Sequence, residues 1–181
     1  MSKLVICEKP SVAKSIASAL GAKSRADGYY EGNGLIVSWC VGHLVSPMEA
    51  AGYDGRFRKW RYDDLPILPE PFRYVLAAGK EDAFENLRCL MNRPDVETVV
   101  NACDAGREGE LIFRLVYEMA GCRKPVERLW ISSMEDMAIR EGFSDLRPGA
   151  EYDALYLFQL HRRGICHQER TAHCAPAPEC R

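Results

Sequence analysis

Apolar residues fall into short blocks along this chain, and the spacing within each block predicts whether it forms a strand or a helix. Four blocks are apolar without alternation, at residues 4–7, at the start of 35–47, at 96–103 and at 127–131. A run of this kind fits a strand that is covered on both faces. The four blocks therefore predict the strands of one buried sheet.

Between these blocks, apolar residues recur at helical spacing. Such patterns cover residues 12–20, 81–91 and 111–119, and each ends at a glycine or shortly before a proline. Residues 132–135 (SSME) match a capping box and predict the start of a further helix that carries Ile139. Strand and helix alternate, which predicts an α/β fold with a mostly parallel sheet flanked by helices.

Two stretches break this alternation. Residues 57–74 are rich in proline and aromatic residues and predict an ordered connection rather than a helix. Residues 161–181 hold three of the four histidines and three of the eight cysteines with almost no apolar periodicity, and their spacing fits no standard zinc knuckle. We therefore expect one domain over residues 1–156, followed by a disordered tail over residues 157–181.

Charge and cysteine content narrow the classes of partner and compartment. The net charge is −2 and the sequence pI is about 6.1, so no global basic field draws the chain to nucleic acid, and any contact with DNA must be local. The eight cysteines are irregularly spaced, which favours a reduced, cytoplasmic setting over a disulfide framework. No apolar run approaches the roughly 20 residues that span a bilayer, so no membrane partner is expected.

Acidic residues follow two of the predicted strands, at the edge where open α/β sheets bind their ligands. Glu8 and Lys9 follow the first strand, and Asp104, Glu108 and Glu110 follow the third. Mg²⁺ prefers a few carboxylates together with water and phosphate oxygens, and a lysine beside it can neutralise a phosphate. The pattern predicts a Mg²⁺ site, although acidic residues also favour the first turn of any helix without binding metal.

Five segments of the chain occur in the order expected for one protein family. They read LVICEKPSVAKSIASALG, WCVGHLVSP, FRKWRYDDLPILP, ACDAGREGELI and RLWISSMEDMAIREGFSDLR. Together they resemble the Toprim domain of type IA DNA topoisomerases, most closely the bacterial topoisomerase III group. The resemblance covers about residues 1–156. It implies a Toprim (Rossmann-like) fold, DNA as the partner and Mg²⁺ as the cofactor.

The resemblance also implies roles for individual residues. Glu8 matches the family's glutamate, which acts as general acid or base toward the leaving ribose oxygen and helps to bind Mg²⁺. Lys9 matches the lysine that steadies the scissile phosphate. Asp104 matches the first aspartate of the Asp-x-Asp turn, which binds the metal. These three residues form the expected catalytic and metal-binding centre.

The turn around Asp104 departs from the family pattern at one position. Gly106 stands where the family has its second aspartate, so Mg²⁺ binding is expected to be weaker and more dependent on DNA phosphates. Glu108 either replaces the missing ligand or faces water as an ordinary glutamate at a helix N-terminus. Arg107 is expected to lie near the DNA backbone, and Gly106 lets backbone N–H groups approach an anion closely.

A second DNA contact is expected from a basic and aromatic cluster at residues 56–62. Arg61 is the residue of this cluster that we assign to DNA binding, through the phosphates. The neighbouring aromatic side chains are suited to stacking on unpaired bases. The expected DNA partner is therefore single-stranded.

Type IA enzymes cut one DNA strand with a tyrosine of a later domain, pass another strand and reseal the break. None of the eight tyrosines has the expected context, and residues 157–170 read LFQLHRRGICHQER in place of the family's arginine-bearing helix and Asp-Trp pair. We expect a Toprim domain truncated before the nucleophile, an isomerase by resemblance that does not turn over alone. The alternatives are a metal-dependent Toprim nuclease, or a non-enzymatic fragment that binds DNA or a partner such as an intact topoisomerase.

Overall fold

The computed structural model describes residues 2–59, 61–64 and 73–162, and a seven-stranded sheet forms its centre. The strands of this sheet are β1 (Ser2–Cys7), β2 (Ser24–Ala26), β3 (Tyr29–Gly32), β4 (Leu35–Trp39), β7 (Val96–Ala102), β8 (Val126–Arg128) and β9 (Arg147–Pro148). Their order across the sheet is β2-β3-β4-β1-β7-β8-β9. A separate two-stranded sheet is made by β5 (Val45–Pro47) and β6 (Tyr74–Leu76).

Helices connect the strands of the sheet and cover its faces. Those within the described residues are α1 (Pro10–Leu20), α2 (Ala50–Tyr53), α3 (Glu81–Met91), α4 (Arg107–Met119), α5 (Asp136–Ser144) and α6 (Asp153–Arg162), with the short 3₁₀ helices η1 (Gly55–Arg58), η2 (Tyr62–Asp64) and η3 (Gly149–Tyr152). Pro10 suits the start of α1, because the N–H that it lacks has no partner at that position. The predicted helices over residues 12–20, 81–91 and 111–119 are confirmed.

The centre of the sheet is parallel and its edges are antiparallel. β4, β1, β7 and β8 lie side by side in parallel, which confirms the predicted α/β fold with a mostly parallel sheet. At one edge β2 and β3 form an antiparallel hairpin against β4, and at the other β9 is antiparallel to β8. The apolar blocks did not predict these edge strands, because none of them is buried on both faces.

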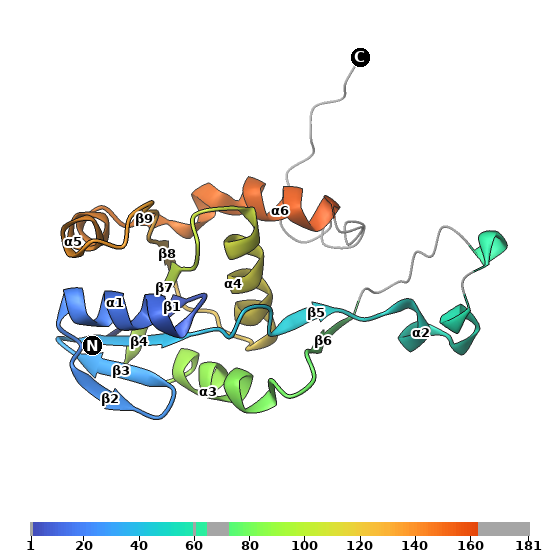
Figure 1. Ribbon diagram of the computed structural model, residues 1–181, viewed down its shortest axis with the longest axis horizontal. Coiled ribbons are helices and arrows are strands. Elements are labelled where there is room, and N and C mark those ends of the chain that lie inside the picture. The colour runs from blue at the N-terminus through green and yellow to red at the C-terminus, as the bar shows by residue number, and fades with distance from the viewer. Residues whose placement is uncertain (1, 60, 65–72, 163–181) are drawn as a thin grey trace, which may run out of the picture.

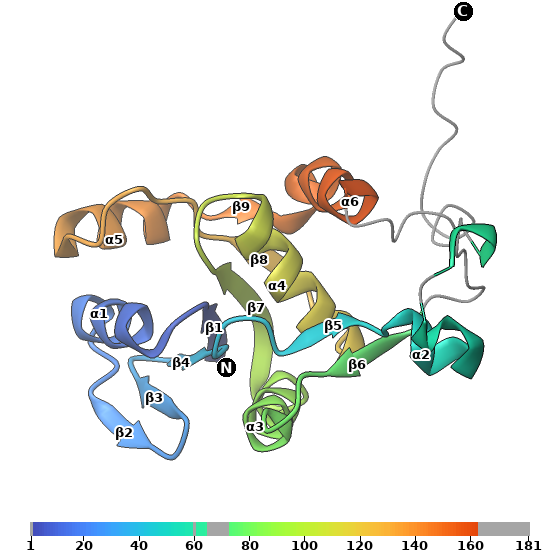
Figure 2. The ribbon, with the colours of Figure 1, turned by 45° about the vertical axis from the view of Figure 1, so that its right-hand side comes forward.

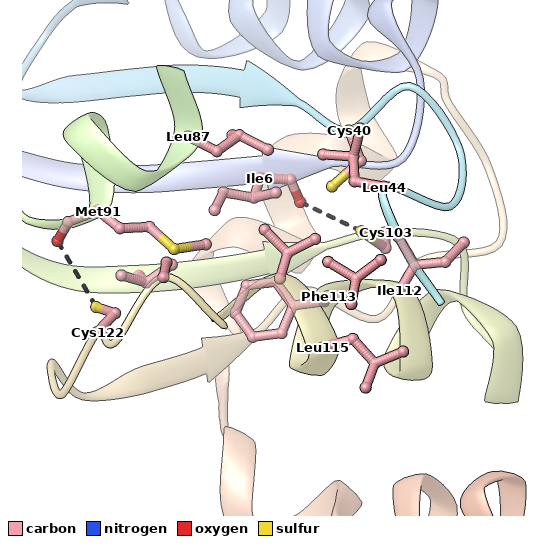
Figure 3. Close-up of a cluster of buried hydrophobic side chains, with 14 of the residues drawn as sticks. Ile6, Cys40, Leu44, Leu87, Met91, Cys103, Ile112, Phe113, Leu115 and Cys122 are labelled. Atoms are coloured by element: carbon pink, nitrogen blue, oxygen red, sulfur yellow. Dashed lines mark hydrogen bonds between the residues drawn. The ribbon is translucent and has the colours of Figure 1, made fainter. Parts of the chain in front are cut away.

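Alternate residues of the central strands face opposite layers of helices. Val5 and Cys7 are buried with Ile16 in the layer of α1 and α5. Leu4 and Ile6 are buried on the other side, against α3, α4 and α6. Figure 1 shows α1 and α3 on opposite sides of the sheet, and Figure 3 shows Ile6 of β1 among side chains of α3 and α4. Burial on both faces explains why these strands read as continuous apolar runs.

Two local predictions differ from the structure in detail. The strand predicted over residues 127–131 ends at Arg128. The predicted capping box is wrong, because Glu135 is itself the residue that precedes the first turn of α5 and makes no side-chain cap. Its backbone N–H donates to Ser133 Oγ at 3.2 Å. Ser133 therefore closes a turn before the helix and does not cap it.

Beyond β5 and β6 the chain extends away from the central sheet as an arm, with α2 at its outer part (Figure 2). The stretch predicted as an ordered connection, residues 57–74, includes the end of η1, all of η2 and the start of β6. Residues 60 and 65–72 lie outside the part of the chain that the structure describes. Within the described part, only short 3₁₀ turns interrupt this connection.

The predicted domain boundary at residue 156 falls inside α6. Tyr156 and Leu160 both belong to the buried cluster beneath α4, so the packed part of the chain includes the middle of this helix. The tail predicted over residues 157–181 lies outside the described residues from position 163 onward. Among the helices that the structure describes, none is long and apolar enough to cross a membrane.

Candidate functional site

The register of the parallel strands brings Glu8 and Asp104 to the same edge of the sheet. Cys7 at the end of β1 is paired with Ala102 at the end of β7, so the residues that follow both strands leave the sheet side by side. Lys9 connects the two carboxylates, with its Nζ 3.5 Å from Glu8 Oε1 and 3.2 Å from Asp104 Oδ2. The structure thus brings together the three residues expected to form the centre of the site.

A pocket of about 380 Å³ lies at this edge of the sheet, and it is lined by Glu8, Asp104, Gly106, Arg107, Glu108, Gly109 and Gln159. The side chain of Glu8 is 14% exposed at its wall, whereas that of Asp104 is 49% exposed. Glu8 is therefore the more shielded of the two carboxylates. The two carboxylates therefore differ in their access to solvent while facing the same pocket.

Lys9 is held between acidic groups without being buried. Its hydrogen bond to Asp104, followed by the charge of Glu8, raises the pKa of Lys9 above its ordinary value. The ammonium group therefore stays charged at neutral pH and marks the position between the two carboxylates as one that favours a cation.

Glu108 lies at the same pocket, but its side chain is held from other directions. Gln159 donates a hydrogen bond from Nε2 to Glu108 Oε1. His43 Nε2 lies 3.4 Å from Glu108 Oε2. Gln159 was not predicted at the site, because only the folded structure brings α6 against the start of α4. Both oxygens of Glu108 have protein partners, so it is less available to a metal than Asp104.

Gly106 and Gly109 have different structural reasons for being glycine. Gly106 has an extended backbone with φ 176°, and a Cβ built there meets nothing within 4 Å. A Cβ on Gly109 would lie 2.2 Å from the backbone oxygen of Asp104. Close packing of α4 on the turn therefore requires Gly109, whereas the space for a carboxylate at position 106 remains.

Glu110, which the sequence grouped with the acidic turn, is not part of the pocket. Its side chain is buried and accepts a hydrogen bond from Asn101 Nδ2 at 2.9 Å, while Arg114 Nε lies 2.9 Å from its Oε1. Arg128 Nε lies 3.3 Å from its Oε2. Glu110 is therefore compensated by two arginines beneath the site and is not free to bind a metal. This corrects the interpretation of Glu110 as a member of the acidic turn that faces the ligand.

Arg128 is a buried residue of the site that the sequence reading missed. Its guanidinium donates to the backbone oxygens of Cys103 at 2.7 Å and Asp104 at 2.8 Å, and also to that of Asn101 at 2.9 Å. Burial lowers the pKa of Arg128, an effect that the charge of Glu110 opposes. Two features of the sequence could have indicated this buried network. Arg128 and Glu110 are charged residues within apolar patterns, and Glu110 and Arg114 have the i, i+4 spacing of an ion pair on a helix.

The two arginines assigned to DNA lie in different places. Arg107 lines the pocket, and its guanidinium carbon lies 5.2 Å from the ring centre of Phe158 on α6. Arg61 is exposed in the arm, between η1 and η2, and does not line the pocket. The structure therefore joins Arg107 to the candidate centre and leaves Arg61 as a separate surface cation.

The side chains that line this pocket include carboxylates, which are possible ligands for Mg²⁺. Among the described residues, no group of three His, Cys, Asp or Glu side chains is close enough to hold a metal ion. Mg²⁺ commonly binds through one or two carboxylates and completes its shell with water and phosphate oxygens. Glu8 and Asp104, which share Lys9 as a cationic neighbour, fit that kind of site. The residues present therefore suit a Mg²⁺ ion that is bound jointly by protein and phosphate.

Comparison with known proteins agrees with this geometry. Residues 3–134 match the family described as the Toprim domain. The chain is 47% identical over 157 residues to DNA topoisomerase 3 of Bacillus subtilis (strain 168), and the aligned region covers 86% of this chain and 22% of that protein. It is 45% identical over 154 residues to DNA topoisomerase 3 of Shouchella clausii (strain KSM-K16), which covers 85% of this chain and 21% of that protein.

Among solved structures, full-length topoisomerase I from Thermotoga maritima is similar in fold, with a TM-score of 0.59. The two share 24% sequence identity, and the match covers 90% of this chain and 23% of that one. The chain thus spans about a fifth of the length of the curated relatives named above.

Proposed function

This chain belongs to the Toprim domain family, and from that membership we propose that it is the Mg²⁺- and DNA-binding domain of a type IA DNA topoisomerase. The observation that carries the proposal is the convergence of Glu8, Lys9 and Asp104 from two strand ends. The chain spans about a fifth of the length of these relatives. We propose that it takes part in the cleavage, strand passage and religation of DNA. Single-stranded DNA is the proposed partner.

Each of the three residues has a proposed task at the scissile phosphate. Lys9 binds a phosphate oxygen through its charged ammonium group, which is exposed beside the pocket-lining carboxylates of Glu8 and Asp104. Glu8, the shielded carboxylate, moves a proton at the ribose oxygen that leaves and later attacks. Asp104 and Glu8 would hold Mg²⁺, which when bound neutralises charge on the phosphate. Glu108 is proposed to support this centre through its contacts with His43 and Gln159.

The strand-cleaving nucleophile is proposed to come from outside this pocket. No tyrosine is among the described residues that line it. This chain then supplies the metal-binding and phosphate-binding half of the reaction. Turnover by the chain alone is not expected, and relaxation of supercoiled DNA belongs to the proposed complete enzyme.

The test is Mg²⁺-dependent binding of a fluorescently labelled single-stranded oligonucleotide, followed by anisotropy with Mg²⁺ or with EDTA. Mg²⁺ is expected to strengthen binding to the wild-type chain. Asp104→Asn is expected to weaken the Mg²⁺-dependent part about tenfold, since one of two charged ligands is lost. Glu141→Gln, on the exposed side of α5, is the matched control and should bind like the wild type.

Two outcomes decide against the proposal. Equal affinity with Mg²⁺ and with EDTA would show that the metal takes no part in the DNA complex. An Asp104→Asn variant that binds like Glu141→Gln would show that Asp104 takes no part in it. The same samples separate the nuclease alternative, because metal-dependent nicking of the oligonucleotide that Glu8→Gln abolishes would show water-driven cleavage without a tyrosine.

A further inference from the structure

One wall of the pocket comes from α6, in the stretch where we expect the sequence to depart from the family pattern. Gln159 of this helix lines the pocket, and its neighbour Phe158 contacts Arg107. We propose that Phe158, with Arg107 and Gln159, forms a subsite that stacks an unpaired nucleobase beside the phosphate-binding centre. This inference rests on the proposed function and adds a base-stacking surface on α6, which lies beyond residues 3–134 that match the Toprim family.

The placement of α6 over α4 is fixed by contacts along the helix. Arg114 Nη2 lies 2.7 Å from Asp153 Oδ1 at its first turn. One turn later, Tyr156 donates from its hydroxyl to Glu118 Oε2 at 3.0 Å. Leu160 is buried in the core beyond them. Figures 1 and 2 both show α6 next to α4, and in Figure 1 the two helices cross. Phe158 is thus presented at a determined position rather than on a free end.

Phe158 is a large apolar side chain that remains exposed. Its relative accessibility is 51%, and the guanidinium carbon of Arg107 lies 5.2 Å from its ring centre. A cation held over an aromatic ring keeps both groups in a defined geometry. An exposed aromatic ring beside an arginine is the combination that proteins use to stack bases of single strands while binding their phosphates.

Gln159 gives a second and independent indication of a ligand at this wall. It lines the pocket although only 5% of the residue is exposed, and its Nε2 donates to Glu108. Its Oε1 is buried and finds no hydrogen-bond donor within the described residues. A buried acceptor without a donor is costly. After a turn of the Gln159 amide toward the pocket, an N–H group of a base can donate to this oxygen, whereas a phosphate has no such donor.

The subsite of Phe158, Arg107 and Gln159 lies beside the phosphate-binding centre, as the base and phosphate of one nucleotide require. Glu8 and Asp104 form the charged side of the pocket with Lys9 against both of them, and Arg107 lines the same pocket next to Phe158. A phosphate bound at the charged side leaves its base to reach an aromatic surface. The subsite would accept any base, because stacking uses the ring face that all bases share.

The experiment compares two oligonucleotides of equal length and charge, one with bases throughout and one with abasic sugars at the central positions. Anisotropy titrations in Mg²⁺ use the full chain and three variants. Phe158→Leu is expected to weaken binding of the base-containing strand about tenfold, as the loss of one stacked base does. Phe158→Tyr should restore the wild-type affinity. Met137→Ala, which alters another exposed apolar residue (70%) on α5, should change nothing.

The wild type should bind the abasic strand more weakly than the intact strand. For the abasic strand, the affinities of the wild type and of Phe158→Leu should be equal. Thermal unfolding confirms that each variant is folded, which half-exposed Phe158 permits. If Phe158→Leu weakens both strands equally, or neither, the stacking subsite is wrong while the proposed function stands. If the wild type binds neither strand in Mg²⁺, the proposed function fails as well.

Discussion

Gly106 and Gly109 lie three residues apart at the start of α4, yet they place opposite demands on a side chain. At Gly106 the backbone is extended and the space around a Cβ is empty, so the conformation suits any residue. At Gly109 a Cβ meets the backbone of Asp104 within α4's first turn. The fold therefore requires glycine at position 109 and leaves room for a side chain at position 106.

Gly109→Ala is predicted to lower the free energy of unfolding by about 1–3 kcal/mol, the usual cost of forcing extra atoms into a packed contact. Alanine ordinarily stabilises a helix relative to glycine by up to about 1 kcal/mol, so a net loss shows that the contact with Asp104 dominates. Urea unfolding measures the difference. Gly106→Ala is the matched control, and it should stay within about 0.5 kcal/mol of the wild type. Equal stability of both variants would contradict the close contact.

Gly106→Asp is predicted to tighten Mg²⁺ binding roughly tenfold, because a third carboxylate then reaches the pocket that Glu8 and Asp104 line. The change in unfolding temperature with Mg²⁺ concentration measures the affinity. An aspartate at this position also caps α4 without any metal, so the control is Gly106→Asn, which caps equally well and carries no charge. If both variants respond to Mg²⁺ alike, position 106 does not face the ion.

At the scale of elements, β7, β8 and α4 are joined beneath the site by one buried polar network. Arg128 of β8 donates to the backbone of the turn after β7, and Glu110 of α4 balances its charge. Asn101 at the end of β7 bridges them, donating to Glu110 and accepting from Arg128. The turn that carries Asp104 is thereby tied to three elements, which fixes its geometry before any ligand arrives.

Glu110→Gln is predicted to destabilise the chain by about 3 kcal/mol or more, because it leaves the buried guanidinium of Arg128 without its compensating charge. Urea unfolding again gives the difference. Glu85→Gln breaks an exposed ion pair with Arg88 on α3 and should have little effect. Similar losses in the two variants would mean that the buried pair contributes no more than a surface pair.

The central elements were predictable because their physical signals are local. A run such as LVIC fits only a strand covered on both faces, and the helical spacing before Gly21 needs no tertiary information. The hairpin of β2 and β3 carries no such signal, since its residues are at most partly buried. The capping box predicted from SSME does not form, because Ser133 Oγ accepts a hydrogen bond from the backbone N–H of Glu135 and closes a turn instead.

The same distinction applies to the site. Glu8, Lys9 and Asp104 could be predicted because parallel strands end at one edge, so two turns far apart in sequence must meet. Gln159 and His43 could not, since their contacts with Glu108 depend on how α6 and the loop after β4 pack across the sheet. Glu110 was misassigned because a glutamate at a helix start looks the same in the sequence whether it faces water or is buried against two arginines.

At the scale of the whole molecule, charge decides how DNA is held. The chain carries a net charge of −2, so its long-range field does not attract a polyanion, and affinity must come from a few local cations and from the proposed metal. Lys9 and Arg107 lie at the pocket, and Arg61 lies on the arm. Few phosphate contacts imply a shallow dependence of DNA affinity on salt.

Two phosphate contacts on a single strand predict a slope of about −1.4 for the logarithm of the binding constant against that of the salt concentration, at roughly −0.7 per contact. Titrations with NaCl at constant Mg²⁺ measure it. Arg107→Gln should make the slope shallower by about 0.7, and Arg61→Gln should do the same only if the arm also contacts DNA. Arg123→Gln removes an exposed cation beyond the far end of α4, about 20 Å along the helix from the pocket, and should leave the slope unchanged. A slope that Arg107→Gln does not alter would place the DNA backbone elsewhere on the molecule, because a cation that contacts a phosphate must release a counterion when it binds.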